Sequence, residues 1–287
     1  MRKTTAFITA IFAAATLNAF DWPQADVTDE SCSSYFAQNR GGILSTSLIF
    51  SEPAEVRAAD DAHILVIMTE QLDDTDFFPS TLGTSVILSH DDSLISVYGN
   101  LAAETLTLKD DSETFVDGQA IMAQSGNSGY QGDRGNLEFQ MIDTKNKSAI
   151  NPKILMPRLS KERPLTLSGI QMESKNGYLY DINTTKTYSS GIYRIYQRRN
   201  LVAAPYRTSV SINGVMVDQI SYDTILQENG KLCVTGKKKY TSRDIYPAEN
   251  MQLLGEAVLS SGRTNLTVYT EDILGNIRQL SYTVTVY

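Results

Sequence analysis

Short segments rich in β-branched and aromatic residues, separated by turn residues, fill almost the whole chain after residue 20. Examples are residues 85–90, 94–98 and 137–142, which are bounded by Gly, Asp or Asn. Runs of this length and composition are typical of β-strands, and no long amphipathic helical pattern follows residue 20. The sequence therefore predicts an all-β fold.

The spacing of these segments indicates two domains. A chain of 287 residues is long for one domain and short for three. The stretch NPKILMP at residues 151–157 closes the first series of strands, and residues 160–164 are polar and end in proline, as in a linker. We expect a first domain at residues 35–158 and a second at residues 165–287.

The second domain carries about seven short strand-like runs with regularly spaced turn signals, which is typical of an immunoglobulin-like β-sandwich. Asn213-Gly214 lies between two apolar-alternating runs and predicts a type I′ hairpin. Leu274, Gly275 and Asn276 similarly join the last two strands. Because Trp22 is the only tryptophan, the Cys-Trp-Cys signature of antibody domains is absent.

The N-terminus has the features of an export signal. Arg2 and Lys3 precede an apolar run at residues 6–17, and Ala19 supplies a small residue for cleavage. We expect a signal peptide at residues 1–19 and a periplasmic or secreted, cell-envelope location; an uncleaved membrane anchor is the alternative. Cys32 and Cys233 fall in different domains, so the sequence leaves open whether they pair.

The net charge of -8 argues against a nucleic-acid partner and against contact with an anionic membrane beyond the signal segment. The basic cluster at residues 237–239 lies beside a glycine and is expected to be a solvated turn.

Four motifs in the first domain occur in a specific order: EVRAADDAHIL at residues 55–65, LGTSVILSHDDSLISVYGNL at 82–101, VDGQAIMAQSGNSG at 116–129, and GNLEFQ at 135–140. From residue 42 to residue 157 the chain resembles the peptidase domain of lysostaphin and LytM, zinc endopeptidases of peptidoglycan with a duplicated-hybrid-motif β-fold. The resemblance implies that fold for the first domain.

That family holds zinc through a His and an Asp of an early His-x-x-x-Asp motif and the second His of a His-x-His motif. The resemblance places five residues of this chain at the ligand and catalytic-histidine positions: Leu44, Leu48, Asn100, Asn136 and Glu138. Leucine cannot bind zinc, and carboxamides neither bind it well nor titrate near neutral pH. We therefore expect no enzyme activity, no metal and no cofactor, and treat these five residues as the lining of a vestigial cleft.

Two histidines remain as candidates for a different site. His90, followed by Asp91 and Asp92, offers residue types that can bind a metal, yet the same run is a good hairpin tip. His63 is a lone imidazole in a strand. We expect a solvated turn at residues 90–92 and an ordinary hydrogen-bonded role for His63.

The sequence predicts an exported, catalytically inactive peptidase-like protein that binds or regulates in peptidoglycan remodelling, with a peptidoglycan fragment or a cell-wall enzyme as its partner. Two alternatives stay open. One is a metal-dependent peptidoglycan endopeptidase with an atypical ligand set. The other is a surface binding protein that acts through the C-terminal sandwich. The five cleft residues either contact a partner or merely pack against one another.

Overall fold

The computed structural model describes residues 20–69, 80–108, 114–129 and 136–287. The predicted export signal at residues 1–19 lies outside these ranges. Strands make up 49% of the chain and helices 5%, which confirms the all-β class. No helix among the described residues is long and apolar enough to cross a membrane.

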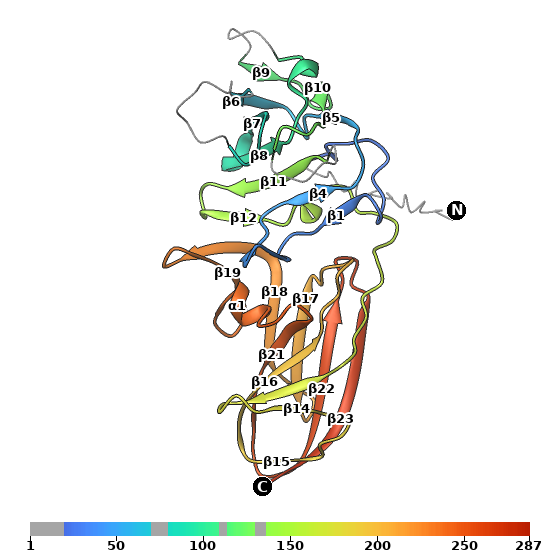
Figure 1. Cartoon of the computed structure of the whole chain (residues 1–287), viewed down its shortest axis with the longest axis vertical. Helices are drawn as coiled ribbons and strands as arrows, with labels where there is room; N and C mark the ends of the chain where they lie inside the picture. The colour runs from blue at the N-terminus through green and yellow to red at the C-terminus, as the bar shows by residue number, and fades with distance from the viewer. Residues whose placement is uncertain (1–19, 70–79, 109–113, 130–135) are drawn as a thin grey trace, which may run out of the picture.

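The first unit, in the upper half of Figure 1, is built on one antiparallel sheet. Its central strand β11 pairs with β8 on one side and with β4 and β12 on the other. The strands of this sheet are β1 (Cys32–Ser34), β4 (Leu48–Phe50), β6 (Ala62–Met68), β7 (Ser85–Ser89), β8 (Leu94–Gly99), β9 (Phe115–Val116), β11 (Glu138–Asp143) and β12 (Ser148–Ile150).

Two short antiparallel strand pairs and three 3-10 turns complete the first unit. The pairs are β2 (Asn39–Arg40) with β3 (Ile43–Leu44), and β5 (Glu55–Arg57) with β10 (Ile121–Gln124). The turns are η1 (Asp91–Ser93), η2 (Ala103–Thr105) and η3 (Pro152–Ile154). The segment 55–68 divides into β5 and β6, because residues 58–61 bend between the two sheets.

Strand β11 shows why this sequence forms a half-buried sheet. Phe139 and Met141 are fully buried, whereas Gln140 and Ile142, which alternate with them, are partly exposed, as expected when successive side chains point to opposite faces. The ring of Phe139 packs 5.2 Å from the ring of Tyr98 on β8, and the Tyr98 hydroxyl accepts a hydrogen bond from the Ala59 N–H. The apolar side of β11 is therefore the centre of the first core.

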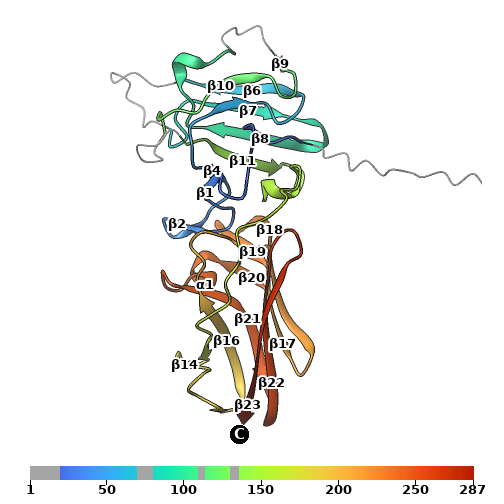
Figure 2. The same ribbon diagram turned by 90° about the vertical axis from the view of Figure 1, so that its right-hand side faces the viewer.

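The second unit consists of two sheets packed face to face, which Figure 2 shows in side view. One sheet contains β15 (Thr187–Tyr188), β17 (Arg207–Ile212), β18 (Val215–Glu228), β19 (Lys231–Thr235), β20 (Lys239–Thr241), β22 (Gly262–Glu271) and β23 (Ile277–Val286). The other contains β13 (Gln171–Ser174), β14 (Leu179–Asp181), β16 (Gly191–Arg198) and β21 (Met251–Leu259). Ile195 and Leu254 from the second sheet share one apolar cluster with Val210 and Val268 from the first.

The turn chemistry of the second unit follows the sequence. Asn213 and Gly214 have φ values of 52° and 81°, the left-handed pair that a type I′ turn needs between β17 and β18, so the predicted hairpin is confirmed. Between β22 and β23, the Asp272 carboxylate accepts hydrogen bonds from the N–H groups of Leu274 and Asn276. The more specific immunoglobulin-like assignment stays a prediction.

The two units share a sheet. Strand β12 pairs with β18 in the register Ser148↔Leu226 to Ile150↔Thr224, so a single path of strands runs through both units. Their cores are also joined: Phe36 and Phe50 belong to the same buried cluster as Tyr222 and Tyr246. The predicted linker at residues 160–164 thus connects two units that already share a sheet and a core.

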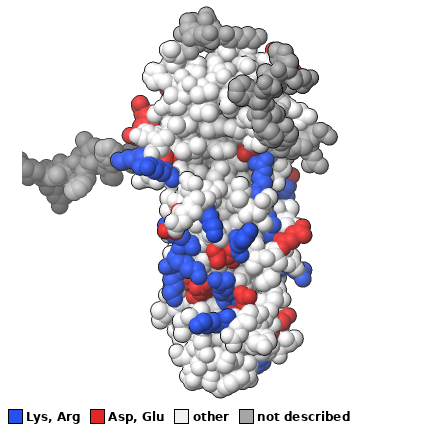
Figure 3. All heavy atoms as spheres, turned by 60° about the vertical axis from the view of Figure 1, so that its left-hand side comes forward, with Lys and Arg blue, Asp and Glu red and all other residues white. Residues whose placement is uncertain are grey.

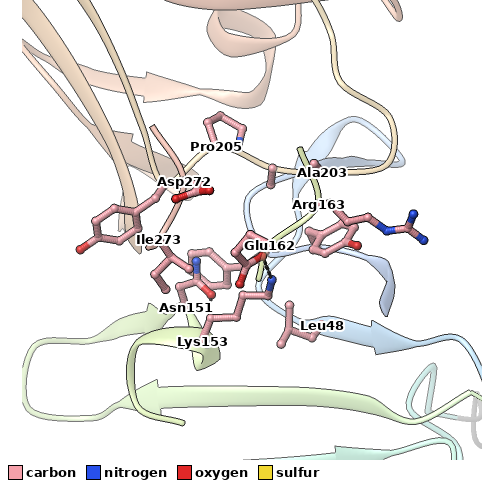
Figure 4. A pocket seen from close by; sticks show the side chains of 13 residues that line it. Leu48, Asn151, Lys153, Glu162, Arg163, Ala203, Pro205, Asp272 and Ile273 are labelled. Carbon is pink, nitrogen blue, oxygen red and sulfur yellow. Dashed lines mark hydrogen bonds and ion pairs between the residues drawn. The ribbon is translucent and has the colours of Figure 1, made fainter. Parts of the chain in front are cut away.

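A small cavity of about 20 Å³ lies at this junction, room for about one water molecule. In Figure 4, Lys153 and Glu162 point toward one another between side chains of both units, and their Nζ and Oε2 atoms are 2.5 Å apart. Both side chains are nearly buried, so each charge depends on the other. The linker residue Glu162 is therefore an anchored part of the junction.

We predict that the two units unfold together. Phe139→Ala should lower the free energy of unfolding by about 3–5 kcal/mol, because it opens a cavity in the core of the first unit. Since the sheet and the core are continuous, hydrogen exchange in β16 and β21 of the second unit should accelerate together with exchange in β11. Mass-spectrometric hydrogen exchange, with calorimetry in parallel, measures both effects.

Phe115→Ala is the matched control, because Phe115 is 46% exposed and its loss should cost less than about 1 kcal/mol. Two separate calorimetric transitions, with the second unit unaffected by Phe139→Ala, would contradict the shared core.

Candidate functional site

A groove of about 480 Å³ opens between the β2–β3 hairpin and the start of β11. Its lining combines three aliphatic side chains, four hydroxyl side chains, one amide and one pair of opposite charges. The lining residues are Arg40, Ile43, Leu44, Ser45, Thr46, Ser47, Thr81, Leu82, Glu138 and Gln140.

Glu138 is the best-anchored polar residue in this groove. It begins β11, where the register places it opposite Ile49 on β4 and Gly99 on β8. Its Oε1 accepts hydrogen bonds from Arg40 Nη1 at 2.9 Å and from Ser47 Oγ at 2.7 Å. The Glu138 side chain is 8% exposed and that of Arg40 is 38% exposed. Bonds of this kind to a charged group are shorter and stronger than neutral ones, so they fix the carboxylate in place.

Asn100 has a structural role that follows from its backbone. Its φ of 63° lies in the left-handed region, which asparagine tolerates better than most residues. Its Nδ2 donates to the carbonyl oxygens of Gly126 at 2.8 Å and Asn136 at 2.7 Å, and its Oδ1 accepts from the Gly129 N–H at 2.7 Å. One fully buried amide thus ties the end of β8 to the turn at residues 126–129 and to the start of β11.

Glycine in that turn is required by close backbone approach. A Cβ added at Gly126 would lie 2.5 Å from the Ala102 amide nitrogen, and one added at Gly83 would lie 2.3 Å from the Ser128 carbonyl carbon. Gly126 does not have a positive φ, so glycine is needed there for the space next to Ala102 and not for a left-handed backbone conformation.

The five residues predicted from sequence do not all meet in the groove. Leu44 and Glu138 line it, whereas Leu48, Asn100 and Asn136 are buried and are not among its lining residues. Leu44 and Leu48 belong to the apolar core. Leu48 packs in the core, and Asn100 forms internal hydrogen bonds, one of them to the Asn136 carbonyl. The Asn136 side-chain Oδ1 is buried and has no hydrogen-bond partner among the described residues.

Sequence reasoning missed Arg40 and Ser47, the two residues that hold Glu138. A signal for Arg40 was present, because it is the only Lys or Arg between residues 4 and 56. No comparable signal marks Ser47 among the serines and threonines around it.

The donor set at this site does not fit a zinc ion. Two of the five positions are hydrocarbons, and the Asn100 amide is already held by three backbone groups. Glu138, the one ligand-type side chain, accepts from a guanidinium that would repel a second cation. Among the described residues, no group of three His, Cys, Asp or Glu side chains is arranged to hold a metal.

His90 is enclosed, although a solvated turn was expected for residues 90–92. Its Nε2 lies 2.7 Å from Ser96 Oγ, its Nδ1 lies 3.1 Å from the Asp61 carbonyl oxygen, and the Phe20 ring packs against it with centroids 4.8 Å apart. Burial is the main cause that lowers the pKa of His90. Asp91 and Asp92 are exposed in η1, as expected for a solvated turn, so only His90 differs from the expectation.

The remaining candidates have ordinary surroundings. His63 is exposed, and its Nδ1 lies 3.3 Å from the Thr114 carbonyl oxygen. Cys32 and Cys233 are both buried, free thiols, so they form no disulfide with each other. Burial raises the pKa of Cys32 to about 12, which keeps it a thiol.

In comparisons with known proteins, one protein-family model matches residues 164–287. No curated protein matches the chain. Solved structures that are similar to the chain include peptidase domains of the M23 type at low identity.

Three of the solved structures illustrate the level of similarity. A chain of the SpoIIIAH and SpoIIQ complex is 16% identical, with 48% of this chain and 99% of that chain covered and a TM-score of 0.37. A variant of the catalytic domain of the prophage-encoded M23 protein EnpA from Enterococcus faecalis is 17% identical, with 42% of this chain and 88% of that chain covered and a TM-score of 0.33. A zinc containing peptidase from Vibrio cholerae is 16% identical, with 43% of this chain and 36% of that chain covered and a TM-score of 0.34. At such identities and TM-scores, what these proteins bind or cleave does not transfer to this chain.

We predict that Asn100→Ala destabilises the fold strongly. The substitution leaves two buried carbonyls and one buried N–H without their partner, at roughly 1–3 kcal/mol for each group. Asn213→Ala is the matched control, since Asn213 also has a positive φ but is exposed. Chemical denaturation of both variants measures the difference, and equal losses would refute the assigned role of Asn100.

We also predict that His90 makes the fold less stable in mild acid. Because the folded pKa lies below the ordinary value of 6.5, the unfolded chain takes up the proton first as the pH falls. The free energy of unfolding therefore decreases as the pH falls below about 6.5, by at most about 1.4 kcal/mol per pH unit. Urea denaturation at several pH values measures this dependence. The free energy of unfolding should fall less steeply with decreasing pH for His90→Gln than for the wild type; the same dependence on pH in both proteins would contradict the prediction.

Proposed function

We propose that the chain is a non-catalytic, peptidase-like module that binds a partner in the cell envelope through the groove at Glu138. The observation that supports this most is the ion pair between Arg40 Nη1 and Glu138 Oε1 at 2.9 Å. It lies at the position that the resemblance assigns to a zinc ligand. A guanidinium of the chain itself neutralises the carboxylate there.

The groove has the chemistry of a peptide-binding site. Ile43 and Leu82 provide an apolar surface, while Thr81 and Gln140 offer a hydroxyl and an amide that can bond to peptide groups. Since the Arg40–Glu138 pair carries no net charge, a neutral backbone is a better match than a strongly charged ligand.

The partner class comes from the sequence resemblance. A domain with the framework of a peptidoglycan endopeptidase and none of its ligands is suited to hold a peptidoglycan fragment without cutting it, or to dock on a cell-wall enzyme. The cell-envelope location is proposed from the composition of residues 1–19. The side chains of Arg40 and Ser47 hold the Glu138 carboxylate in place in the groove. We assign no catalytic step to any of the three residues.

We predict saturable binding of muropeptides by the mature chain in isothermal titration, with a dissociation constant in the micromolar to millimolar range. Thr81→Trp should weaken binding at least tenfold, because Thr81 lines the groove and is exposed, so a large ring there obstructs the site without disturbing the core. Thr285→Trp, an exposed position at the far end of β23, is the matched control and should bind like the wild type.

Two results would overturn the proposal. The first is no binding at millimolar muropeptide, or equal binding by the wild type and Thr81→Trp. The second is stoichiometric zinc in the purified mature chain together with muropeptide cleavage, which would make the chain an endopeptidase with an atypical ligand set.

A further inference from the structure

The two units differ in charge. Residues 164–287 contain 13 Lys and Arg against 10 Asp and Glu, a net charge of +3. The rest of the chain contains 12 against 23, a net charge of -11, which together give the -8 of the whole chain. Figure 3 shows the Lys and Arg side chains gathered over the lower half of the molecule, with acidic groups among them.

A second groove, of about 360 Å³, lies on this basic unit, well separated in sequence from Glu138. It crosses the outer face of the sheet formed by β13, β16 and β21. The lining residues are Glu173, Ser174, Lys175, Gly177, Ile192, Arg194, Lys238 and Glu256.

The register of the strands aligns three of these charges. Glu173, Arg194 and Glu256 are direct cross-strand neighbours on β13, β16 and β21. Glu256 Oε1 accepts from Arg194 Nε at 3.1 Å and from Lys238 Nζ at 2.7 Å, so this carboxylate is shared by two cations. Glu173 Oε2 accepts from the Tyr196 hydroxyl at 3.0 Å.

One cation of the groove has no such partner. Lys175 is exposed in the turn between β13 and β14, and it forms no ion pair with any residue that the structure describes. The groove therefore contains three cations and two carboxylates, and beside it Asp244 Oδ1 lies 3.8 Å from Arg194 Nη2. Arg194 and Lys238 already have carboxylate partners, so Lys175 is the cation of the groove that an incoming anion can pair with.

An apolar strip lies beside these cations. Ile192 is two residues from Arg194 on β16, so both side chains point to the outer face, and Ile192 is 50% exposed. Its cross-strand neighbour Val258 is 53% exposed, and Leu179, the neighbour of Glu173 on β14, is 47% exposed. Exposed aliphatic side chains next to cations suit a peptide that carries both acidic and apolar residues, whereas a sulfated glycan or polyphosphate has nothing to place on them.

We propose that this groove is a second binding site, which takes an acidic peptide segment of a protein partner. A carboxylate of the segment lies between Lys175, Arg194 and Lys238, and an apolar residue beside it packs on Ile192 and Val258. The site does not depend on the groove at Glu138.

The test is fluorescence anisotropy of the full mature chain with a labelled, blocked peptide of alternating Leu and Glu. Binding should be saturable, and it should weaken as NaCl is raised from about 50 to 300 mM, because the charges are exposed. Lys175→Glu should weaken it about tenfold, since a repulsion replaces an attraction of similar size. Ile192→Ser should also weaken it, which a purely electrostatic patch would not show.

Lys231→Glu is the matched control, an exposed lysine on β19 outside the groove, and it should bind like the wild type. Thr81→Trp should also leave this binding unchanged, which separates the test from that of the first groove. The proposal is overturned if the peptide with Gln in place of Glu binds equally well, or if dextran sulfate or polyphosphate binds while the peptide does not. It is equally overturned if Lys231→Glu weakens binding as much as Lys175→Glu, or if nothing binds at millimolar peptide.

Discussion

The pairing of β12 with β18 is the interaction on which the arrangement of this protein depends. It makes one sheet of two units, and the aromatic residues around it form one core. Because of this pairing, the second unit also holds the β2–β3 hairpin of the first: Ser242 Oγ donates to Asn39 Oδ1 at 3.1 Å, and the Tyr246 hydroxyl donates to the Ala37 carbonyl at 3.1 Å. Arg40 follows directly in that hairpin, so the position of the guanidinium at Glu138 is set by residues more than 200 positions away in the chain.

The Arg40–Glu138 pair neutralises a nearly buried carboxylate with a side chain of the same protein. A buried carboxylate without a partner is costly, and removing a cation from its side usually destabilises the fold. Here the cation is a side chain, and the Ser47 hydroxyl supplies a second hydrogen bond. The polar framework is thereby satisfied internally.

The sequence was sufficient for local features and insufficient for distant ones. Alternation along β11 and the Asn213-Gly214 turn could be predicted, because each is governed by neighbouring residues. The β12–β18 pairing could not, since an edge strand of the first unit meets an internal strand of the second at a separation of more than 70 residues. The Arg40–Glu138 contact depends on the same long-range geometry. Asn100 was assigned to the cleft from its place in a motif, yet its left-handed backbone turns the amide toward three backbone groups instead.

Sharing one sheet has a consequence for binding. A partner that contacts both grooves meets two sites at a fixed separation, so no linker has to be ordered when the second contact forms. The sites also differ in charge, because the first is balanced by the Arg40–Glu138 pair, whereas the second contains Lys175, which forms no ion pair with a residue that the structure describes. A partner with a neutral peptide segment and an acidic one would therefore bind in a single orientation. The rigid junction would convert two weak contacts into one specific interaction.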